Sequence, residues 1–411
     1  MTAPELLALI CATLLLQVVA GAGVALWRRR RGAESPPEAA IANAAPAPAG
    51  AWPGWRDFRV ARREFEDAAQ SQCSFYLEPA DGQPLPAFRP GQFLTFSLRV
   101  AGDAVPVRTV TRCYSLSDCP DPSHYRITVK RVPAPADRPD LPPGISSTHL
   151  HDQVREGDVL SVRAPAGQFF IDADASIPAV LIAGGIGITP MMSMLRWCLR
   201  EQPQREVHLY YGLRRSDEHA FKSQLESLAE AHARFHLNVV YSRPDTGDVE
   251  GRDYQHAGHV DVDLLRRSLP HGRHRFFVCG PPAMMNSLVP ALAAWGVARE
   301  DIHHEAFGPA APRGAPGVPD RPADAAESIE IRFARTGRTL LWSGQDASLL
   351  DFAERNGVAV DSGCRSGSCG SCETKLVSGE VRYADTPDHV IAAGHCLLCV
   401  GKPSSPLVLD A

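Results

Sequence analysis

The feature that most constrains this chain is a run of three cysteines near its C-terminus. Cys364, Cys369 and Cys372 form a C-x4-C-x2-C pattern. This spacing is typical of a [2Fe–2S] cluster, which needs a fourth cysteine further along the chain. One loop can wrap a compact cluster only if its backbone turns sharply, and the glycines interleaved with the cysteines permit such turns. A structural zinc site is the alternative, although zinc ligands usually come as two separated pairs.

The fourth ligand is either Cys396 or Cys399. In extended backbone, residues three positions apart lie on opposite faces, so we do not expect both thiols to reach one cluster. Most of the other cysteines are scattered along the chain. That scatter favours a reducing compartment over a disulfide framework. The residues alone leave the choice of the fourth ligand open.

An uncharged run at residues 6–27 predicts a transmembrane anchor. As a helix it would extend about 33 Å, enough to cross a hydrocarbon core of roughly 30 Å. Arg28–Arg31 follow directly, and positive charge marks the cytoplasmic side. We therefore expect a single pass through the inner (cytoplasmic) membrane, with the catalytic domains in the cytoplasm. A cleaved signal peptide is the alternative, but Glu5 is the only charge before the run, and such peptides begin with positive charge.

Two segments rich in Ala and Pro, at 28–52 and 309–327, predict linkers. The first is expected to be disordered. Between and after them we expect three folded domains, at 53–170, 176–308 and 328–411. The net charge of −5 is mild, and no basic stripe with interleaved aromatic residues occurs. Nucleic acid is therefore not an expected partner.

The two middle domains differ in pattern. Short runs of alternating apolar and polar residues predict an antiparallel β-barrel over 53–170; they lie at 92–98, 125–130 and 159–163. Apolar runs that alternate with helical stretches predict a parallel α/β sheet over 176–308. The apolar runs lie at 179–183, 207–211 and 276–279, and the helical stretches at 190–200 and 221–231.

The first cofactor motif lies within the predicted barrel. In Arg112-Cys-Tyr114-Ser115, the arginine can clamp a flavin phosphate, and the tyrosine can stack on the isoalloxazine ring. Ser115 points to the other side and can approach the ring's N5. An ordinary edge strand with a surface arginine is the alternative. Further on, Gly144, Ser146, Ser147 and Thr148 bring donors to a predicted helix start, a place that suits a phosphate.

The second motif follows an apolar strand of the α/β domain. Gly184, Gly185 and Gly187 let the backbone approach a pyrophosphate, Thr189 is a candidate N-cap, and Pro190 fits the first helical turn. A generic strand-to-helix turn is the alternative. Cys279, Gly280 and Pro281 end another predicted parallel strand, and ligands bind at such ends in open α/β sheets.

Together these motifs resemble the ferredoxin–NADP reductase superfamily over residues 55–308, and the flavohaemoglobin reductase module in particular. The resemblance implies a flavin-binding barrel followed by a nicotinamide-nucleotide domain. The matching residues are Arg112, Tyr114 and Ser115 (R-x-Y-S), Ser147 (G-x-x-S), Gly184 to Thr189 (the glycine motif), Cys279, Gly280 and Pro281 (C-G-P near the nicotinamide), and Glu305, Phe307 and Gly308 (E-x-F-G-P, whose aromatic packs near the flavin). Ser115, Cys279 and Glu305 are thereby the expected catalytic residues.

Residues 328–411 resemble a plant-type ferredoxin domain, which implies an α+β fold of the β-grasp type. In that family the last cluster ligand lies in an apolar strand ahead of a proline and an acidic end. Cys399, ahead of Pro403 and Asp410, matches this pattern. The resemblance therefore implies Cys364, Cys369, Cys372 and Cys399 as the ligands, with Cys396 as a bystander.

These parts predict an NAD(P)H-dependent electron-transfer reductase. A nicotinamide donates two electrons as a hydride, a [2Fe–2S] cluster accepts one, and a flavin can do both. The flavohaemoglobin-like module implies FAD rather than FMN. The expected acceptor is a redox protein, such as an oxygenase or a hybrid-cluster protein. A membrane-tethered redox sensor or scaffold without turnover is the alternative, but such a protein needs no hydride donor.

Overall fold

The computed structural model describes residues 51–411, apart from 103–104, 135–138, 141, 173, 308–327, 366, 368, 385–386 and 388. The predicted anchor at 6–27, most of the linker at 28–52 and the linker at 309–327 lie outside the described residues. Within the part of the chain that the structure describes, no helix is both long and apolar enough to cross a membrane.

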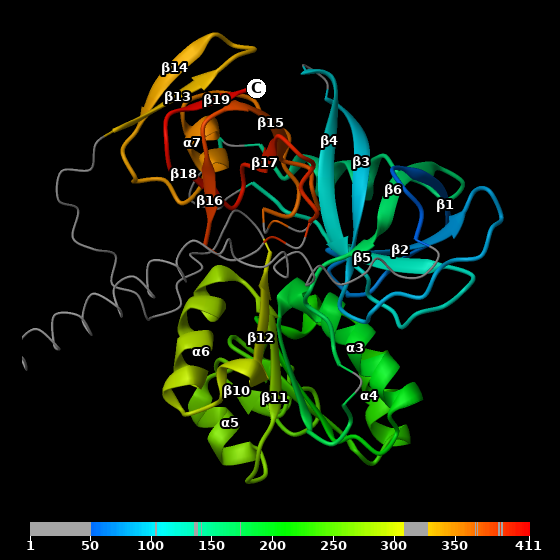
Figure 1. The fold of residues 1–411 in the computed structure, drawn as a ribbon. Coiled ribbons are helices and arrows are strands. Elements are labelled where there is room, and N and C mark those ends of the chain that lie inside the picture. Colours follow the sequence, from blue (N-terminus) through cyan, green and yellow to red (C-terminus); the bar gives the residue numbers. More distant parts are fainter. Residues whose placement is uncertain are drawn as a thin grey trace, which may run out of the picture. The chain divides into compact units, whose positions relative to one another are not determined.

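The first domain is an antiparallel six-stranded sheet with the order β4-β3-β6-β1-β2-β5 (Figure 1). Its strands are β1 (Arg56–Phe65), β2 (Gln72–Pro79), β3 (Phe93–Gly102), β4 (Val105–Ser115), β5 (Tyr125–Lys130) and β6 (Val159–Ala166), and helix α2 (Ile145–Asp152) lies between β5 and β6. A bridge between Leu116 and Ile127 joins the end of β4 to β5, the two outer strands. The predicted antiparallel barrel is therefore confirmed.

Alternation along the barrel strands builds the first core. Phe58 and Val60 of β1 are fully buried, while their neighbour Arg59 is exposed. Phe75 and Leu77 of the adjacent strand join the same apolar cluster. This period of two is the pattern that a strand with one buried face requires.

The second domain is a fully parallel six-stranded sheet with the order β10-β9-β8-β7-β11-β12. Its strands are β7 (Ala179–Gly184), β8 (Val207–Leu213), β9 (Phe235–Tyr241), β10 (His256–Ala257), β11 (Arg275–Gly280) and β12 (Ile302–Ala306). Its helices are α3 (Ile188–Glu201), α4 (Lys222–Ala231), α5 (Val262–Ser268) and α6 (Pro282–Ala294), with short 3₁₀ turns η2 (Gly185–Gly187), η3 (Ser216–Glu218) and η4 (Arg299–Asp301). The predicted parallel α/β sheet is confirmed.

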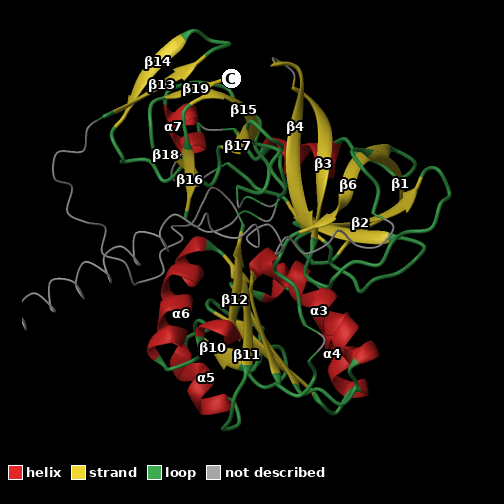
Figure 2. Ribbon diagram, viewed as in Figure 1, coloured by secondary structure: helices red, strands yellow, loops and turns green. Residues whose placement is uncertain are grey.

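The parallel sheet is covered on both faces, with α3 and α4 on one side and α5 and α6 on the other (Figure 2). Strand β7 shows how its sequence permits this. Leu181 belongs to the core cluster on the α3 side, whereas Val180 and Ile182 belong to the cluster that includes α5 and α6. All of β7 is buried, as expected for a central parallel strand.

The C-terminal domain has a mixed five-stranded sheet with the order β14-β13-β19-β15-β17, and a separate pair β16-β18. Its elements are β13 (Ile329–Phe333), β14 (Arg338–Trp342), α7 (Leu349–Arg355), β15 (Glu373–Ser378), β16 (Val381–Tyr383), β17 (His395–Leu397), β18 (Gly401–Pro403) and β19 (Leu407–Leu409). Ser348 caps α7, because its hydroxyl accepts from the Asp351 N–H (3.2 Å). The buried residues of this domain form a core cluster of their own.

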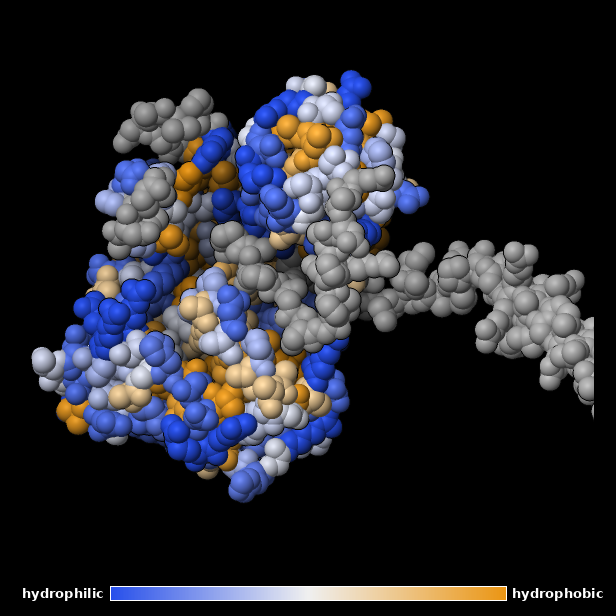
Figure 3. All heavy atoms as spheres, turned by 90° about the vertical axis from the view of Figure 1, so that its left-hand side faces the viewer, coloured by the Kyte–Doolittle hydropathy of each residue, from blue (hydrophilic) through white to orange (hydrophobic). Residues whose placement is uncertain are grey.

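On the face shown in Figure 3, the described residues are mostly hydrophilic, and apolar residues gather in separate patches. Isolated apolar patches of this kind are ordinary on folded proteins.

Candidate cofactor and electron-transfer sites

The nucleotide site predicted from the glycine motif lies at the switch point of the parallel sheet. From β7 the chain moves outward through β8 and β9, then returns to β11 on the other side of β7. Ligands bind at such a point, outside the carboxyl ends of the strands. Gly184 ends β7 and Gly280 ends β11. The structure therefore brings the two separate glycine motifs together.

These two motifs touch closely enough to exclude side chains. A Cβ on Gly187 would lie 2.1 Å from the carbonyl oxygen of Cys279. A Cβ on Gly184 would lie 2.6 Å from Cδ of Pro281. Gly185 has φ +52° and open space around it, so this position favours glycine for its backbone conformation and not for lack of room.

One detail of the predicted helix start is wrong. Thr189 is not the N-cap of α3, because the helix begins at Ile188 and its N-cap is Gly187. The Thr189 hydroxyl instead donates to the carbonyl of Ile186 (3.0 Å). The 3₁₀ turn of the glycine motif runs directly into α3, so the cap position falls on a glycine. Pro190 lies in the first turn, as predicted.

The other residues expected near the nicotinamide lie on neighbouring strands. Cys279 and Glu305 are register partners in the β11–β12 pair. Burial, reinforced by the Glu305 charge, raises the pKa of the Cys279 thiol well above its usual value, so the thiol stays neutral. Phe307 packs against the core on the α3 side of the sheet. Gly308 lies outside the described residues.

The R-x-Y-S motif forms the end of β4. Tyr114 packs edge-on against Phe96, with ring centroids 5.6 Å apart. Arg112 is exposed, and its Nη1 donates to the Thr111 carbonyl (2.7 Å). Ser115 faces the other way and is buried, and its hydroxyl has no hydrogen-bond partner among the described residues. An orphaned buried hydroxyl at this position suits a bound ring with polar edges.

The start of α2 offers a second set of polar groups. The Ser147 hydroxyl donates to Gly144 O (2.9 Å) and accepts from the Val132 N–H (3.1 Å). The buried hydroxyls of Ser146 and Thr148 have no partner among the described residues. A helix start has unpaired N–H groups and a positive dipole end, so this place fits a phosphate. Ser147 thus already serves the local fold, while Ser146 and Thr148 have free capacity.

The predicted cluster ligands lie together. The N–H of Cys364 donates to the sulfur of Cys369 (3.2 Å), and the N–H of Cys369 donates to the sulfur of Cys364 (3.3 Å). The N–H of Cys399 donates to the sulfur of Cys372 (3.4 Å). The Cys399 thiol also hydrogen-bonds the Cys372 sulfur, which raises the pKa of Cys399 and lowers that of Cys372. Four sulfurs gathered in this way fit a [2Fe–2S] cluster.

The loop geometry supports the same fit. Gly367 and Gly370 have φ of +79° and +70°, so the sharp turns fall where glycine was expected. Gly363 has a steric role, because a Cβ there would lie 2.8 Å from the Cys369 sulfur.

Cys396 and Cys399 are separated by a change in backbone. Cys396 lies in β17, is 1 % exposed and pairs with Thr374 of β15. The strand ends at Leu397, and Cys399 follows in a turn. The expectation that the last ligand lies in a strand is therefore wrong for this chain. Cys396 and Cys399 take different positions because the strand ends between them, and not because they alternate along one strand.

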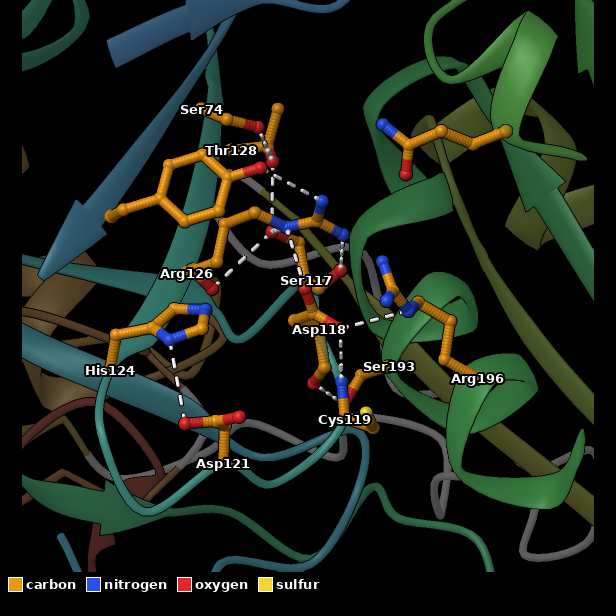
Figure 4. A network of polar contacts seen from close by, with 12 residues as sticks. Ser74, Ser117, Asp118, Cys119, Asp121, His124, Arg126, Thr128, Ser193 and Arg196 are labelled. Atoms are coloured by element: carbon orange, nitrogen blue, oxygen red, sulfur yellow. Dashed lines mark hydrogen bonds and ion pairs between the residues drawn. The ribbon is translucent and has the colours of Figure 1, made fainter. Parts of the chain in front are cut away.

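Sequence reasoning missed a buried arginine that links two domains (Figure 4). Arg126 of β5 is 1 % exposed. Its Nε donates to the Ser117 hydroxyl (3.2 Å). Asp118, next along the chain, pairs with Arg196 of α3 (3.0 Å), and the Ser193 hydroxyl donates to the Asp118 carbonyl (2.7 Å). The loop after the R-x-Y-S motif is thereby fastened to the helix that follows the glycine motif. Arg126 takes a polar position in an alternating strand, which predicts an exposed side chain, so no sequence signal pointed to its burial.

A cavity of about 420 Å³ lies beside this network and is lined by Asp118, Cys119, Asp121, His124, Arg196, Leu199, Arg200, Leu228 and His232. None of the predicted cofactor residues lines it.

Two known families match separate parts of the chain. An oxidoreductase NAD-binding domain matches residues 181–289, which contain both glycine motifs. A 2Fe-2S iron-sulfur cluster binding domain matches residues 332–404, which contain the gathered cysteines.

Similar proteins agree with this division. A flavohemoprotein of Bacillus cereus is 39% identical over 261 residues, which cover 63% of this chain and 63% of that protein. The chain thus spans a little under two thirds of that relative's length. The structure of phthalate dioxygenase reductase is 28% identical in sequence, with a TM-score of 0.51. The match covers 87% of this chain and 98% of the reductase.

The FAD/NAD-binding domain of nitric oxide dioxygenase from Vibrio cholerae is 33% identical, with a TM-score of 0.54. That match covers 62% of this chain and 99% of the domain. The chain therefore belongs to the flavohaemoglobin-like family of FAD- and NAD-binding reductases, and it is an oxidoreductase that joins this module to a [2Fe–2S] domain.

Proposed function

We propose that this protein takes a hydride from NAD(P)H onto FAD and delivers single electrons through its [2Fe–2S] cluster to a protein acceptor. The observation that carries the proposal is the presence, in one chain, of a glycine-lined switch point, a barrel with orphaned hydroxyls and four gathered cysteines. Each set suits one of the three cofactors. A bound flavin supplies the conversion between a two-electron donor and a one-electron acceptor.

In the barrel, we assign Tyr114 to stacking against the flavin ring and Ser115 to the ring's polar edge. Arg112 is exposed on the same strand, so it is free to turn toward a phosphate with a charge-assisted contact. Ser146 and Thr148 have hydroxyls free to bind phosphate oxygens at the start of α2. These residues hold and orient the cofactor, and none needs to act as an acid or base.

In the α/β domain, the backbone of Gly184–Gly187 is assigned to the pyrophosphate of the nucleotide, because Gly184 and Gly187 leave no room for a side chain and Gly185 has a positive φ. Cys279 and Glu305 are assigned to the nicotinamide end of the crevice. The neutral Cys279 thiol packs against the ring rather than attacking it, since only a thiolate is a strong nucleophile.

We assign Cys364, Cys369, Cys372 and Cys399 as the four cluster ligands. Arg163 of β6 donates to the carbonyl of Cys369 (3.2 Å), so a barrel strand contacts the loop assigned to the cluster. This contact favours direct electron transfer between flavin and cluster.

An oxygenase is the favoured class of acceptor, because phthalate dioxygenase reductase matches most of this chain in both sequence and fold. A hybrid-cluster protein remains the other acceptor in the proposal. We further propose that residues 6–27 anchor the protein in the inner membrane, with the reductase on the cytoplasmic side. The support is the uncharged run followed by Arg28–Arg31.

Deletion of residues 328–411 tests the relay. The deleted domain has its own core cluster, so the remaining domains keep theirs. We expect the truncated protein to reduce ferricyanide with NAD(P)H at a rate near that of the full chain, because small oxidants take electrons directly from reduced flavin. Cytochrome c, used as a one-electron protein acceptor, should be reduced much more slowly.

Two outcomes would contradict the proposal. Loss of ferricyanide reduction on truncation would show that hydride transfer depends on the cluster domain. Absence of steady NAD(P)H oxidation by the full chain with either acceptor would favour the sensor alternative.

A further inference from the structure

We propose that Glu206, His208 and His236 form a binding site for a divalent transition-metal ion of the Zn²⁺ type. One ligand atom from each of these side chains lies within 4.8 Å of the others. The site is separate from the three cofactor sites and goes beyond the proposed electron relay.

The parallel sheet itself assembles this cluster. His208 of β8 and His236 of β9 are register partners on adjacent parallel strands. Their rings stack with centroids 4.5 Å apart and planes 19° apart. Glu206 lies two residues before His208, so its side chain is on the same face of the sheet in extended backbone. The strand pairing therefore fixes the backbone positions of all three groups.

Glu206, His208 and His236 lie at the amino-terminal ends of the parallel strands, whereas the nucleotide site lies at the carboxyl ends. Val207 at the start of β8 pairs with Ala179 at the start of β7, whereas the glycine motif follows the end of β7 at Gly184. A metal ion here would therefore join β8 to β9 without touching the hydride-transfer residues. We infer a stabilising role for the α/β domain rather than a catalytic one.

In the structure, a hydrogen bond holds the Glu206 carboxylate against the His236 ring, where a metal ion would bind both groups. Oε2 of Glu206 lies 2.8 Å from Nε2 of His236, and Oε1 accepts from Arg234 Nη1 (2.8 Å). An ion would replace the proton between the first pair, while Arg234 keeps the carboxylate oriented, as outer partners of metal ligands do. The positive Arg234 opposes the ion, but its side chain is 47% exposed and its charge is screened.

His208 supplies the fixed ligand. It is 5% exposed, and its ring packs against those of His236 and His274, with ring centroids 4.5 Å and 6.1 Å away. Bonds of about 2.0–2.2 Å to tetrahedral zinc would draw the three ligand atoms to roughly 3.3 Å from one another. The side chains of His236 and Glu206 are 46% and 36% exposed, so they have room to move inward. Two histidines and one carboxylate leave a fourth position for water.

The test uses the full chain with flavin and cluster bound, and Zn²⁺ as the probe. Equilibrium dialysis with metal analysis should show one zinc bound per chain at micromolar free Zn²⁺, in addition to the cluster iron. X-ray absorption at the zinc edge should show only nitrogen and oxygen neighbours. Binding should also raise the melting temperature of the α/β domain, because a ligand that binds only the folded state stabilises it.

His236→Gln and Glu206→Gln should each weaken zinc binding at least tenfold. The control is His259→Gln, since this histidine is exposed and does not belong to the proposed zinc site. Both test residues are partly exposed, so the variants should fold normally. Absence of stoichiometric zinc in the unaltered protein, sulfur neighbours at the zinc, or unchanged affinity in both test variants would overturn the proposal. The three residues would then be an ion pair beside a buried histidine.

Discussion

The cluster domain and the reductase part of this protein place their functional groups in different ways. Three of the proposed cluster ligands lie on one loop, 364–372, and the fourth lies in a turn just after β17. The proposed flavin and nucleotide contacts run from Arg112 to Phe307 and come from several strands and helix starts. A loop motif keeps its spacing in the sequence, whereas a site shared by several strands exists only once the strands have paired.

This difference implies different responses to mutation. A cluster has four bonds to the protein, so loss of one ligand removes or badly alters it. A flavin or nucleotide is held by many weaker contacts, each worth about 0.5–3 kcal/mol. We therefore expect abrupt losses in the cluster domain and graded losses in the reductase part.

The largest expected effect is that of Cys399→Ala. This change should abolish the [2Fe–2S] absorption and electron paramagnetic resonance signals while flavin content stays normal. Cys396→Ala is the matched control, because Cys396 lies three residues away, belongs to the same core cluster and pairs with Thr374 of β15. Retention of the cluster in Cys399→Ala together with its loss in Cys396→Ala would reverse the assignment.

The next effect is that of Gly187→Ala on hydride transfer. The new methyl group would meet the Cys279 carbonyl at 2.1 Å, and backbone cannot move aside cheaply. The two glycine motifs should separate, and NAD(P)H-driven ferricyanide reduction should fall more than tenfold with the cluster signals unchanged. Gly247→Ala, where nothing lies within 4 Å, is the control. Normal activity in Gly187→Ala would mean that the crevice between β7 and β11 does not bind the nucleotide.

A smaller, graded effect is expected for Arg112→Ala. Loss of one charge-assisted phosphate contact should cost roughly 1.5–3 kcal/mol, or about 10- to 150-fold in flavin affinity. Arg108→Ala serves as the control, because Arg108 is also exposed on β4 and points to the same side as Arg112. Flavin binding measured by fluorescence quenching should separate the two variants. Equal affinities would remove Arg112 from the site.

The last prediction concerns acid. His219 of the α/β domain is 3% exposed, and its Nδ1 lies 2.8 Å from the Tyr241 hydroxyl. Burial lowers the pKa of His219 to about 3, against about 6.5 in the unfolded chain. Between these values the unfolded state binds one more proton, so the stability from this group is present above pH 6.5. It is lost at about 1.4 kcal/mol per unit as the pH falls toward 3.

Within the described part of the cluster domain, no histidine is buried to this degree. We therefore expect mild acid to unfold the α/β domain before the cluster domain, as monitored by protein fluorescence and cluster absorption. His219→Gln should flatten the acid dependence of α/β domain stability. An unchanged acid profile in that variant would show that other groups dominate.

Much of this protein was determined by its sequence alone, wherever neighbours in the chain are neighbours in space. The alternation that gives strands, the C-x4-C-x2-C loop and the strand–glycine–helix pattern at 179–190 are local features, and the structure agrees with them. One local prediction was wrong: Thr189 is not the N-cap of α3, because the 3₁₀ turn at Gly185–Gly187 runs directly into the helix and makes Gly187 the cap.

Only the tertiary structure decided which distant residues meet. The contact of Gly187 with Cys279, the fastening of Asp118 to Arg196 and the pairing of His208 with His236 all arise from strand order and register. A sequence pattern carries the period of each strand but not its neighbour. Parallel strands are joined through crossovers, so partners that lie side by side are far apart in the chain. The physical reason is that register is set by burial of whole sheet faces, which no single segment encodes.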